Sequence, residues 1–228
     1  MQREYPEILY EDNHIIIVSK RSSDLVQGDG TGDEPLDDIV RSYIKEKYNK
    51  PGDVFLGVVH RLDRPVSGCV VYARTSKALT RLSELFRTRE VKKTYWAIVT
   101  DRPPAEEGTL SNWLKKNEKQ NKSYVYGTEV KGSKLAELSY RILSRSERYY
   151  LLEVDLQTGR HHQIRAQLAA AGCPIKGDLK YGAKRSNEGG GISLHSRRVS
   201  FIHPVRKEEI KAEAPLPADR IWKLFANV

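Results

Sequence analysis

Cysteine is scarce in this chain of 228 residues, which contains only Cys69 and Cys173. Neither lies in a Cys-x-x-Cys spacing, so a disulfide framework and a cysteine-based metal site are excluded, and we expect two reduced packing thiols. No apolar run approaches the roughly 20 residues of a membrane span. The first seven residues lack the apolar core of a signal peptide, so we expect a cytosolic protein. No glycine-rich loop precedes Lys-Ser or Lys-Thr, and a bound nucleoside triphosphate is not expected.

Positive charge is in excess. Lysine and arginine total 39 against 30 aspartate and glutamate residues, which gives a formal net charge of +9. Such a surplus favours a polyanionic partner, and it is also found on proteins whose basic surface serves only solubility. The charge alone therefore indicates a class of partner and no reaction.

The hydrophobic patterning predicts many strands and few helices. Apolar residues at helical spacing predict helices over 34–48, 76–89, 158–172 and 218–226. Short β-rich runs predict strands over 8–10, 14–19, 54–59, 69–74, 91–100, 108–114, 122–126, 134–143, 149–156, 192–202 and 209–214. So many strands with so few helices between them predict an α+β fold with a mixed, largely antiparallel sheet flanked by helices.

Segments between the elements show no domain boundary. Lys115–Lys122 is typical of a polar basic loop, and Ser186–Gly191 is typical of a flexible one. No internal repeat and no linker divides the chain, so we predict a single domain over residues 1–228.

The stretch His60-Arg61-Leu62-Asp63-Arg64-Pro65-Val66-Ser67-Gly68 concentrates charge between two apolar runs. Asp63 either lies in an exposed turn with its charge in water, or its basic neighbours and a low-dielectric pocket keep it ionised as a nucleophile or base. Two later stretches favour the second reading. They are Lys92-Lys93-Thr94-Tyr95 and Gly159-Arg160-His161-His162-Gln163-Ile164-Arg165.

Together, in this order and spacing, the three stretches resemble the RluA family of pseudouridine synthases. The resemblance begins near Ile8–Asn13 and continues through Cys173–Asp178, Tyr181-Gly182, Leu194-His195 and Phe201–Pro204. It implies the pseudouridine synthase catalytic fold with a central active-site cleft. It further implies isomerisation of specific uridines to pseudouridine in structured ribosomal or transfer RNA, without a cofactor.

The resemblance also implies roles for individual residues. Asp63 matches the catalytic aspartate, Tyr95 the tyrosine whose ring stacks on uracil, and Arg165 the arginine placed against the aspartate. An arginine there would depress the pKa of Asp63 and orient it. Arg61 is a candidate to fill the gap left by a flipped-out nucleotide. Basic residues of the same motifs are expected to contact RNA: His60, Arg61, Arg64, Arg160 and His162.

The chain departs from the family at one place. Relatives follow the first hairpin with Lys-Pro-x-Gly, whereas this chain has Lys20-Arg21-Ser22-Ser23, which puts the expected rigid turn in question. Many relatives carry a small RNA-binding domain ahead of the catalytic part. This sequence starts at the catalytic part, so we expect target choice to lie in the catalytic domain itself or in its loops. We also expect a monomer.

Two other functions were weighed. An RNA-binding or RNA-chaperone protein on the same fold is the main alternative, and the altered Lys20–Ser23 segment is the observation that favours it. A metal-dependent hydrolase is disfavoured, because adjacent His161 and His162 point to different sides of a helix and no His-x-x-x-His pair has an acidic partner. We therefore expect no metal.

Overall fold

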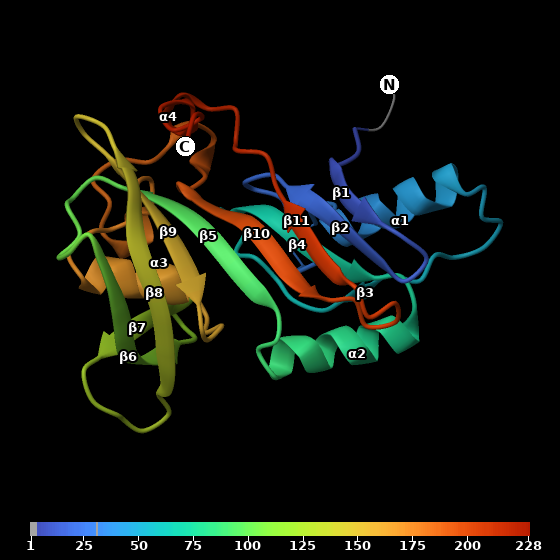
Figure 1. Ribbon diagram of the computed structural model, residues 1–228, viewed down its shortest axis with the longest axis horizontal. Helices are drawn as coiled ribbons and strands as arrows, with labels where there is room; N and C mark the ends of the chain where they lie inside the picture. Colours follow the sequence, from blue (N-terminus) through green and yellow to red (C-terminus); the bar gives the residue numbers. More distant parts are fainter. Residues whose placement is uncertain (1–3, 31) are drawn as a thin grey trace. The chain divides into compact units, whose positions relative to one another are not determined.

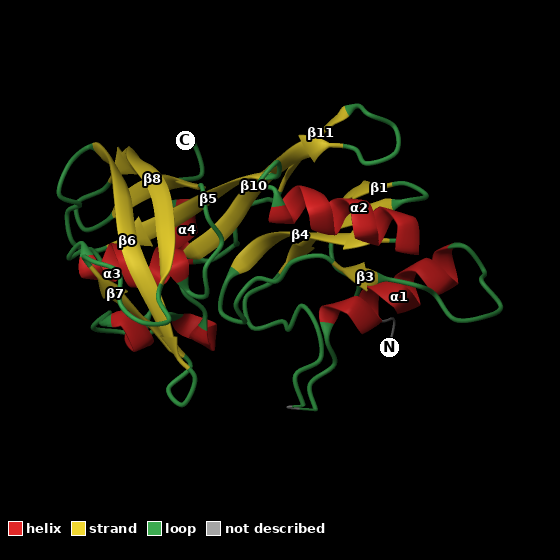
Figure 2. Ribbon diagram, turned by 90° about the horizontal axis from the view of Figure 1, so that it is seen from below, coloured by secondary structure: helices red, strands yellow, loops and turns green. Residues whose placement is uncertain are grey.

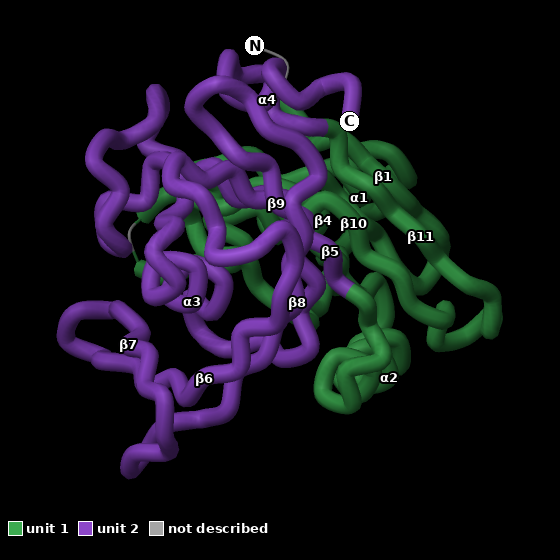
Figure 3. The backbone as a smooth tube through the Cα atoms, turned by 60° about the vertical axis from the view of Figure 1, so that its left-hand side comes forward, with its two compact units in different colours: residues 1–92, 196–215 green, residues 93–195, 216–228 purple. Residues whose placement is uncertain are grey.

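The computed structural model describes residues 4–30 and 32–228. They form two compact units (Figure 3). The first comprises the described residues up to Lys92 together with Ser196–Pro215, and the second comprises Lys93–His195 and Leu216–Val228. Two of the boundaries fall inside strands, which explains why no linker composition marks them. The prediction of one domain over 1–228 stays a prediction.

The first unit is a sheet with a helix on each side (Figures 1 and 2). Its strands run in the order β1-β2-β4-β10, with β3 paired to β4 and β11 to β10. The pairs β1–β2, β2–β4, β3–β4 and β10–β11 are antiparallel. The bounds are β1 Ile8–Glu11, β2 Ile15–Lys20, α1 Leu36–Lys47, β3 Gly57–Val58, β4 Ser67–Ala73, α2 Ser76–Arg87, β10 Leu194–Ile202 and β11 Glu209–Glu213.

Strand β2 is buried on both faces because each face is covered. Ile15 and Ile17 pack in one cluster with Ala78 and Leu82 of α2. Ile16, between them on the opposite face of the strand, is also fully buried.

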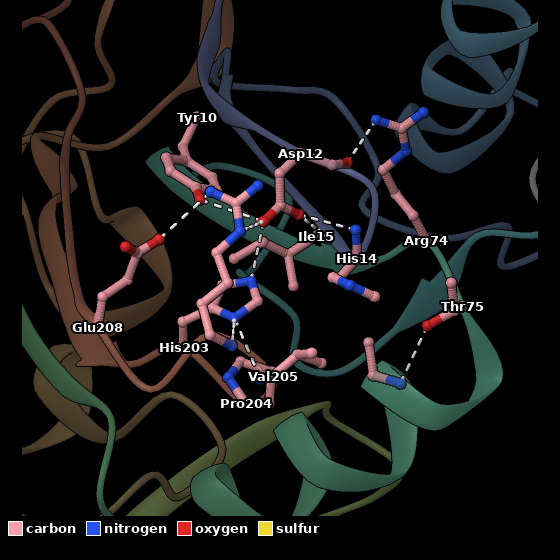
Figure 4. A network of polar contacts seen from close by, with 12 residues as sticks. Tyr10, Asp12, His14, Ile15, Arg74, Thr75, His203, Pro204, Val205 and Glu208 are labelled. Carbon is pink, nitrogen blue, oxygen red and sulfur yellow. Dashed lines mark hydrogen bonds and ion pairs between the residues drawn. The ribbon is translucent and has the colours of Figure 1, made fainter.

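A polar network joins the β1–β2 turn to the β10–β11 turn (Figure 4). The Asp12 carboxylate accepts hydrogen bonds from the backbone N–H groups of His14 and Ile15. His203 Nδ1 accepts from two backbone N–H groups of its own turn, so its proton is on Nε2, which lies 3.0 Å from Asp12 Oδ2. The Asp12 contacts close the turn that joins β1 to β2.

The second unit is a five-stranded antiparallel sheet in the order β5-β9-β8-β6-β7. Its elements are β5 Lys92–Val99, β6 Glu107–Asn117, β7 Lys122–Tyr126, β8 Lys134–Arg145, β9 Tyr150–Leu156, α3 Gln163–Ala170, η1 Leu179–Tyr181, η2 Glu188–Gly190 and α4 Arg220–Lys223. Trp96, Ile98 and Leu151 pack on Trp222 of α4 on one face. Ala136 packs on Ala166 of α3 on the other face.

The predicted fold class is confirmed, whereas several element boundaries were wrong. Strand 54–59 shrinks to β3, helix 218–226 to α4, and helix 34–48 begins after Pro35, which is its N-cap. Helix 76–89 ends at Arg87 and is capped by Thr75. The loop predicted over Lys115–Lys122 is only residues 118–121, because the first three residues continue β6 and Lys122 begins β7. Cross-strand pairing there overrides the low strand propensity of lysine and asparagine.

Both thiols are buried and free, as predicted. Burial raises the pKa of Cys69 to about 12 and that of Cys173 to about 11.

Candidate active site

Asp63 of the first unit lies on a turn that is anchored at both ends. Leu62 and Val66 are buried, and the Val66 N–H donates to the Asp63 carbonyl at 3.0 Å. Gly68, where β4 begins, has φ +113°, and a Cβ there would lie 2.3 Å from the Ser196 carbonyl oxygen. Only glycine allows this approach. The anchors hold Asp63, itself half-buried, in one place between them.

Lys20 is buried beside this turn. Its side chain is 1% exposed, and its Nζ donates to the carbonyls of Arg21 at 2.9 Å and Arg64 at 3.0 Å. Burial lowers the pKa of Lys20 to about 8, and the carboxylates of Asp24 and Asp63 partly oppose that effect. The sequence predicted no role for Lys20, although a charged residue at the end of an apolar strand indicates a buried polar contact.

The altered segment Lys20–Ser23 forms a turn despite its missing proline and glycine. The Ser23 N–H donates to the Arg64 carbonyl at 2.9 Å, and Ser22 Oγ donates to the Pro65 carbonyl at 3.1 Å. Ser23 occupies the place of the relatives' glycine and has φ +80°, a conformation that favours glycine. This segment therefore supports the Asp63 turn at some conformational cost.

The basic residues around Asp63 differ in what their side chains do. His60 Nε2 accepts from the Val71 N–H at 3.0 Å, and its ring stacks on Phe86 with centroids 4.6 Å apart. Arg64 donates from Nε to the Ser23 carbonyl and pairs with Asp33. Arg61 is exposed. His60 thus packs within the unit, and Arg61 is the member of this group whose side chain reaches solvent most directly.

Tyr95 of the second unit lies on β5 opposite Val154 of β9, which in turn lies opposite Tyr140 of β8. Directly opposed residues share a face, and β8 residues alternate, so Tyr95 is on the same face as Ala136. That face is the one on which α3 packs. Tyr95 and the helix that carries Arg165 therefore share one side of this sheet.

The helix predicted from Thr158 begins at Gln163 instead. His162 has φ +53°, which is left-handed and interrupts the helix. Gln163 Oε1 accepts from Thr158 Oγ1 at 2.8 Å and from the Arg160 N–H at 2.9 Å. These bonds fold residues 158–163 into a tight turn, which Arg160 ties to β8 through Nε and the Leu135 carbonyl at 2.9 Å.

Arg165 forms a bidentate ion pair with Asp178. Its Nε lies 2.6 Å from Oδ2 and its Nη2 lies 2.9 Å from Oδ1, with both side chains buried. Its guanidinium carbon lies 5.1 Å from the centre of the Tyr181 ring. Paired contacts of this kind fix the orientation of a guanidinium. Asp178 ends the Cys173–Asp178 stretch of the family resemblance, but the sequence predicted no role for it.

The two adjacent histidines belong to a hydrogen-bond chain. The Tyr181 hydroxyl accepts from the Ser123 N–H at 2.8 Å and forms a second hydrogen bond with His162 Nδ1 at 3.0 Å. His161 stacks on His162 with centroids 3.8 Å apart. Burial first, and then Arg165, lowers the pKa of His162 to about 2. His162 is therefore neutral near pH 7, and its burial does not favour the predicted RNA contact.

A profile of the RNA pseudouridylate synthase family matches residues 14–170, which include Asp63, Tyr95 and Arg165. The chain belongs to this family.

Curated members of the family resemble the chain over most of its length. The ribosomal large subunit pseudouridine synthase C of Buchnera aphidicola is 35% identical over 219 residues, covering 93% of this chain and 68% of the relative. The ribosomal large subunit pseudouridine synthase D of Pseudomonas aeruginosa is 31% identical over 232 residues, covering 96% and 70%. The chain thus spans about two thirds of the length of these relatives.

A solved structure of the family has the same fold. It is human RNA pseudouridylate synthase domain containing 4, with a TM-score of 0.81 and 24% identity, and the match covers 96% of this chain and 92% of that one. The predictions of the family, the fold class and an RNA pseudouridine synthase enzyme are confirmed. Asp63 belongs to the first unit and Tyr95 and Arg165 to the second, so their joint site stays a prediction.

The described residues contain neither a group of metal ligands nor a membrane-spanning helix. No three histidine, cysteine, aspartate or glutamate side chains there are grouped to hold a metal ion. No helix in residues 4–30 and 32–228 has the length and apolarity to cross a membrane.

Proposed function

We propose that this chain converts uridines of large-subunit ribosomal RNA to pseudouridine in the cytoplasm, with Asp63 as the essential carboxylate and no cofactor. The observation that carries the proposal is the half-buried aspartate on a turn that a buried lysine and two buried apolar residues anchor. The names of two relatives support ribosomal RNA as the substrate.

The reaction breaks the bond between ribose carbon 1′ and uracil nitrogen 1, turns the base and rejoins it through carbon 5. Nitrogen 1 ends with a proton and carbon 5 loses one, so no atoms are gained and no redox partner is needed. Asp63 serves the first stage, either by attacking carbon 1′ or by stabilising the cation left there. Tyr95 stacks on the detached base, and its hydroxyl lies near the carbon 5 proton in the second stage.

Arg165 orients the Asp63 carboxylate in this scheme. Asp178 fixes the orientation of the Arg165 guanidinium, because its carboxylate accepts hydrogen bonds from Nε and Nη2. Arg61 takes the stacking position that the extruded uridine vacates. The alternative of an RNA chaperone was based on the altered Lys20–Ser23 segment. That segment still forms the turn that supports Asp63, so it no longer favours the alternative.

The test uses ribosomal RNA transcribed with tritium at uracil carbon 5, because the reaction releases that proton to water. We expect Asp63→Asn to abolish tritium release while RNA binding survives. The matched control is Asp53→Asn, since Asp53 is exposed and lies in the same unit. Undiminished release from Asp63→Asn would overturn the assignment of the carboxylate.

A further inference from the structure

The β6–β7 hairpin of the second unit presents aromatic and polar side chains together on one face. Its cross-strand pairs are Trp113 with Tyr126, Lys115 with Tyr124 and Asn117 with Lys122, and the members of each pair share a face. Tyr124 is 40% exposed and Tyr126 is 37% exposed. We call these six residues the hairpin face.

The opposite side of the same hairpin is packed. Leu114 of β6 and Val125 of β7 contact Ala166 of α3 in an apolar cluster. Ser123, which points the same way, is 3% exposed. The strand pattern therefore divides the hairpin cleanly, and the exposure of the tyrosines does not result from a poorly packed segment.

The hairpin is also strongly basic. Residues 113–134 include six lysines and two glutamates, so this tenth of the chain carries a net +4 of the total of +9. Lys115, Lys119, Lys131 and Lys134 are all exposed. A concentration of this size attracts phosphates.

Solubility alone does not explain the combination. β7 ends the strand order of this sheet, and lysines on an edge strand protect it from pairing with other chains. Exposed tyrosines would work against that protection. Exposed aromatic rings beside cations are instead typical of a surface that binds single-stranded nucleic acid, because unpaired bases stack on the rings and phosphates contact the ammonium groups.

One residue of the hairpin face, Lys122, connects it around the edge of the sheet to the side on which α3 packs. Lys122 Nζ lies 5.7 Å from the centre of the Tyr124 ring and 5.1 Å from that of Tyr181. The guanidinium of Arg165 lies 5.1 Å from the same Tyr181 ring. In Figure 1, β6 and β7 lie beside α3, and the Ser123 N–H donates to the Tyr181 hydroxyl. The face itself points away from α3, so an RNA strand on it reaches the α3 side by passing around the sheet edge at Lys122.

From these observations we infer that the hairpin face binds the unpaired RNA segment that flanks the modified uridine. The inference rests on the proposed function for the identity of that uridine, and it adds where the substrate strand is held. Tyr124 and Tyr126 supply stacking, and Lys115 and Lys122 supply phosphate contacts. None of these four residues acts on the reacting atoms.

The test measures the affinity of the full chain for a labelled RNA stem-loop with a uridine-rich loop. We expect Tyr124→Ala/Tyr126→Ala to weaken binding about ten-fold per tyrosine, and Tyr124→Phe/Tyr126→Phe to restore it, because stacking needs only the ring. We expect Lys115→Gln/Lys122→Gln to reduce the dependence of affinity on salt by about 0.7 in log–log slope per lost contact. The control Lys45→Gln/Lys50→Gln removes two exposed charges from the first unit and should leave binding unchanged.

Tritium release at saturating RNA separates this inference from the proposed function. The alanine variant should reach the wild-type rate once the RNA is saturating. Unchanged affinity in the alanine variant, with a normal circular dichroism spectrum, would overturn the inference and leave the face to another partner such as an acidic protein. A wild-type chain that binds RNA through the face but releases no tritium would overturn the proposed function alone.

Discussion

Replacing Lys20 with methionine tests how the turn below Asp63 is held. The lysine is 1% exposed and donates to two backbone carbonyls, and burial lowers its pKa from 10.5 to about 8. It is therefore mostly charged at pH 7 and neutral at pH 10 in the folded protein. Methionine has a similar length and cannot titrate.

The magnitude follows from the linkage between protonation and folding. A pKa that falls from 10.5 to about 8 corresponds to a cost of about 3.4 kcal/mol for burying the charge. Between these pH values the unfolded chain binds more protons at Lys20 than the folded chain, so raising the pH stabilises the wild type relative to the variant. From pH 7 to pH 10 the relative gain is about 2.5 kcal/mol.

The assay is urea unfolding of the wild type and Lys20→Met at several pH values from 7 to 10. The difference in unfolding free energy should move by about 2.5 kcal/mol in favour of the wild type. Exposed Lys45, replaced in the same way, should show a difference that changes by less than about 0.5 kcal/mol. A difference in unfolding free energy between Lys20→Met and the wild type that stays constant with pH would refute the lowered pKa of Lys20.

Further predictions concern other parts of the site. Ser23→Gly should raise the free energy of unfolding by about 0.5–1 kcal/mol in urea, since φ is +80° there, and a loss of stability would contradict this. Asp178→Asn should cost about 3–5 kcal/mol in the same assay because it leaves Arg165 buried without its carboxylate, and a loss below about 1 kcal/mol would contradict the ion pair. The ring signals of His162 should not titrate between pH 5 and pH 8 in NMR, because the pKa is lowered to about 2, and a midpoint near 6.5 would exclude the buried neutral ring. Tyr95→Phe should keep RNA affinity and lose most tritium release, whereas full release would show that its hydroxyl is dispensable.

The predicted elements were right where one local pattern dominated. Alternating or helical apolar spacing located α1, α2 and most strands to within a few residues. The predicted start of α3 was wrong, because hydrogen bonds from Thr158 and Arg160 to the Gln163 side chain hold a turn that no periodicity reveals. Lys115 and Lys116 were wrongly assigned to a loop, because their strand state depends on pairing with β7.

The candidate site shows the same division. The motif around Asp63 identified the turn, but the buried partner of that turn, Lys20, lies more than forty positions away in the sequence. The motif ending in Arg165 identified the arginine, but its bidentate pairing with Asp178 depends on how α3 and the segment before η1 pack. Neither partnership follows from the spacing of charges along the chain.

The order and spacing of its motifs by themselves determined the family, the α+β class and the residues on which the chemistry depends, because those signals are local and carried by residue type. Tertiary structure decided which charges are buried and what they contact. Burial makes Lys20 a structural cation of lowered pKa, turns His162 into a neutral ring and exposes Tyr124 and Tyr126 on a basic hairpin. The physical reason is that solvation and pairing depend on neighbours brought together by folding, and residue type alone does not specify those neighbours.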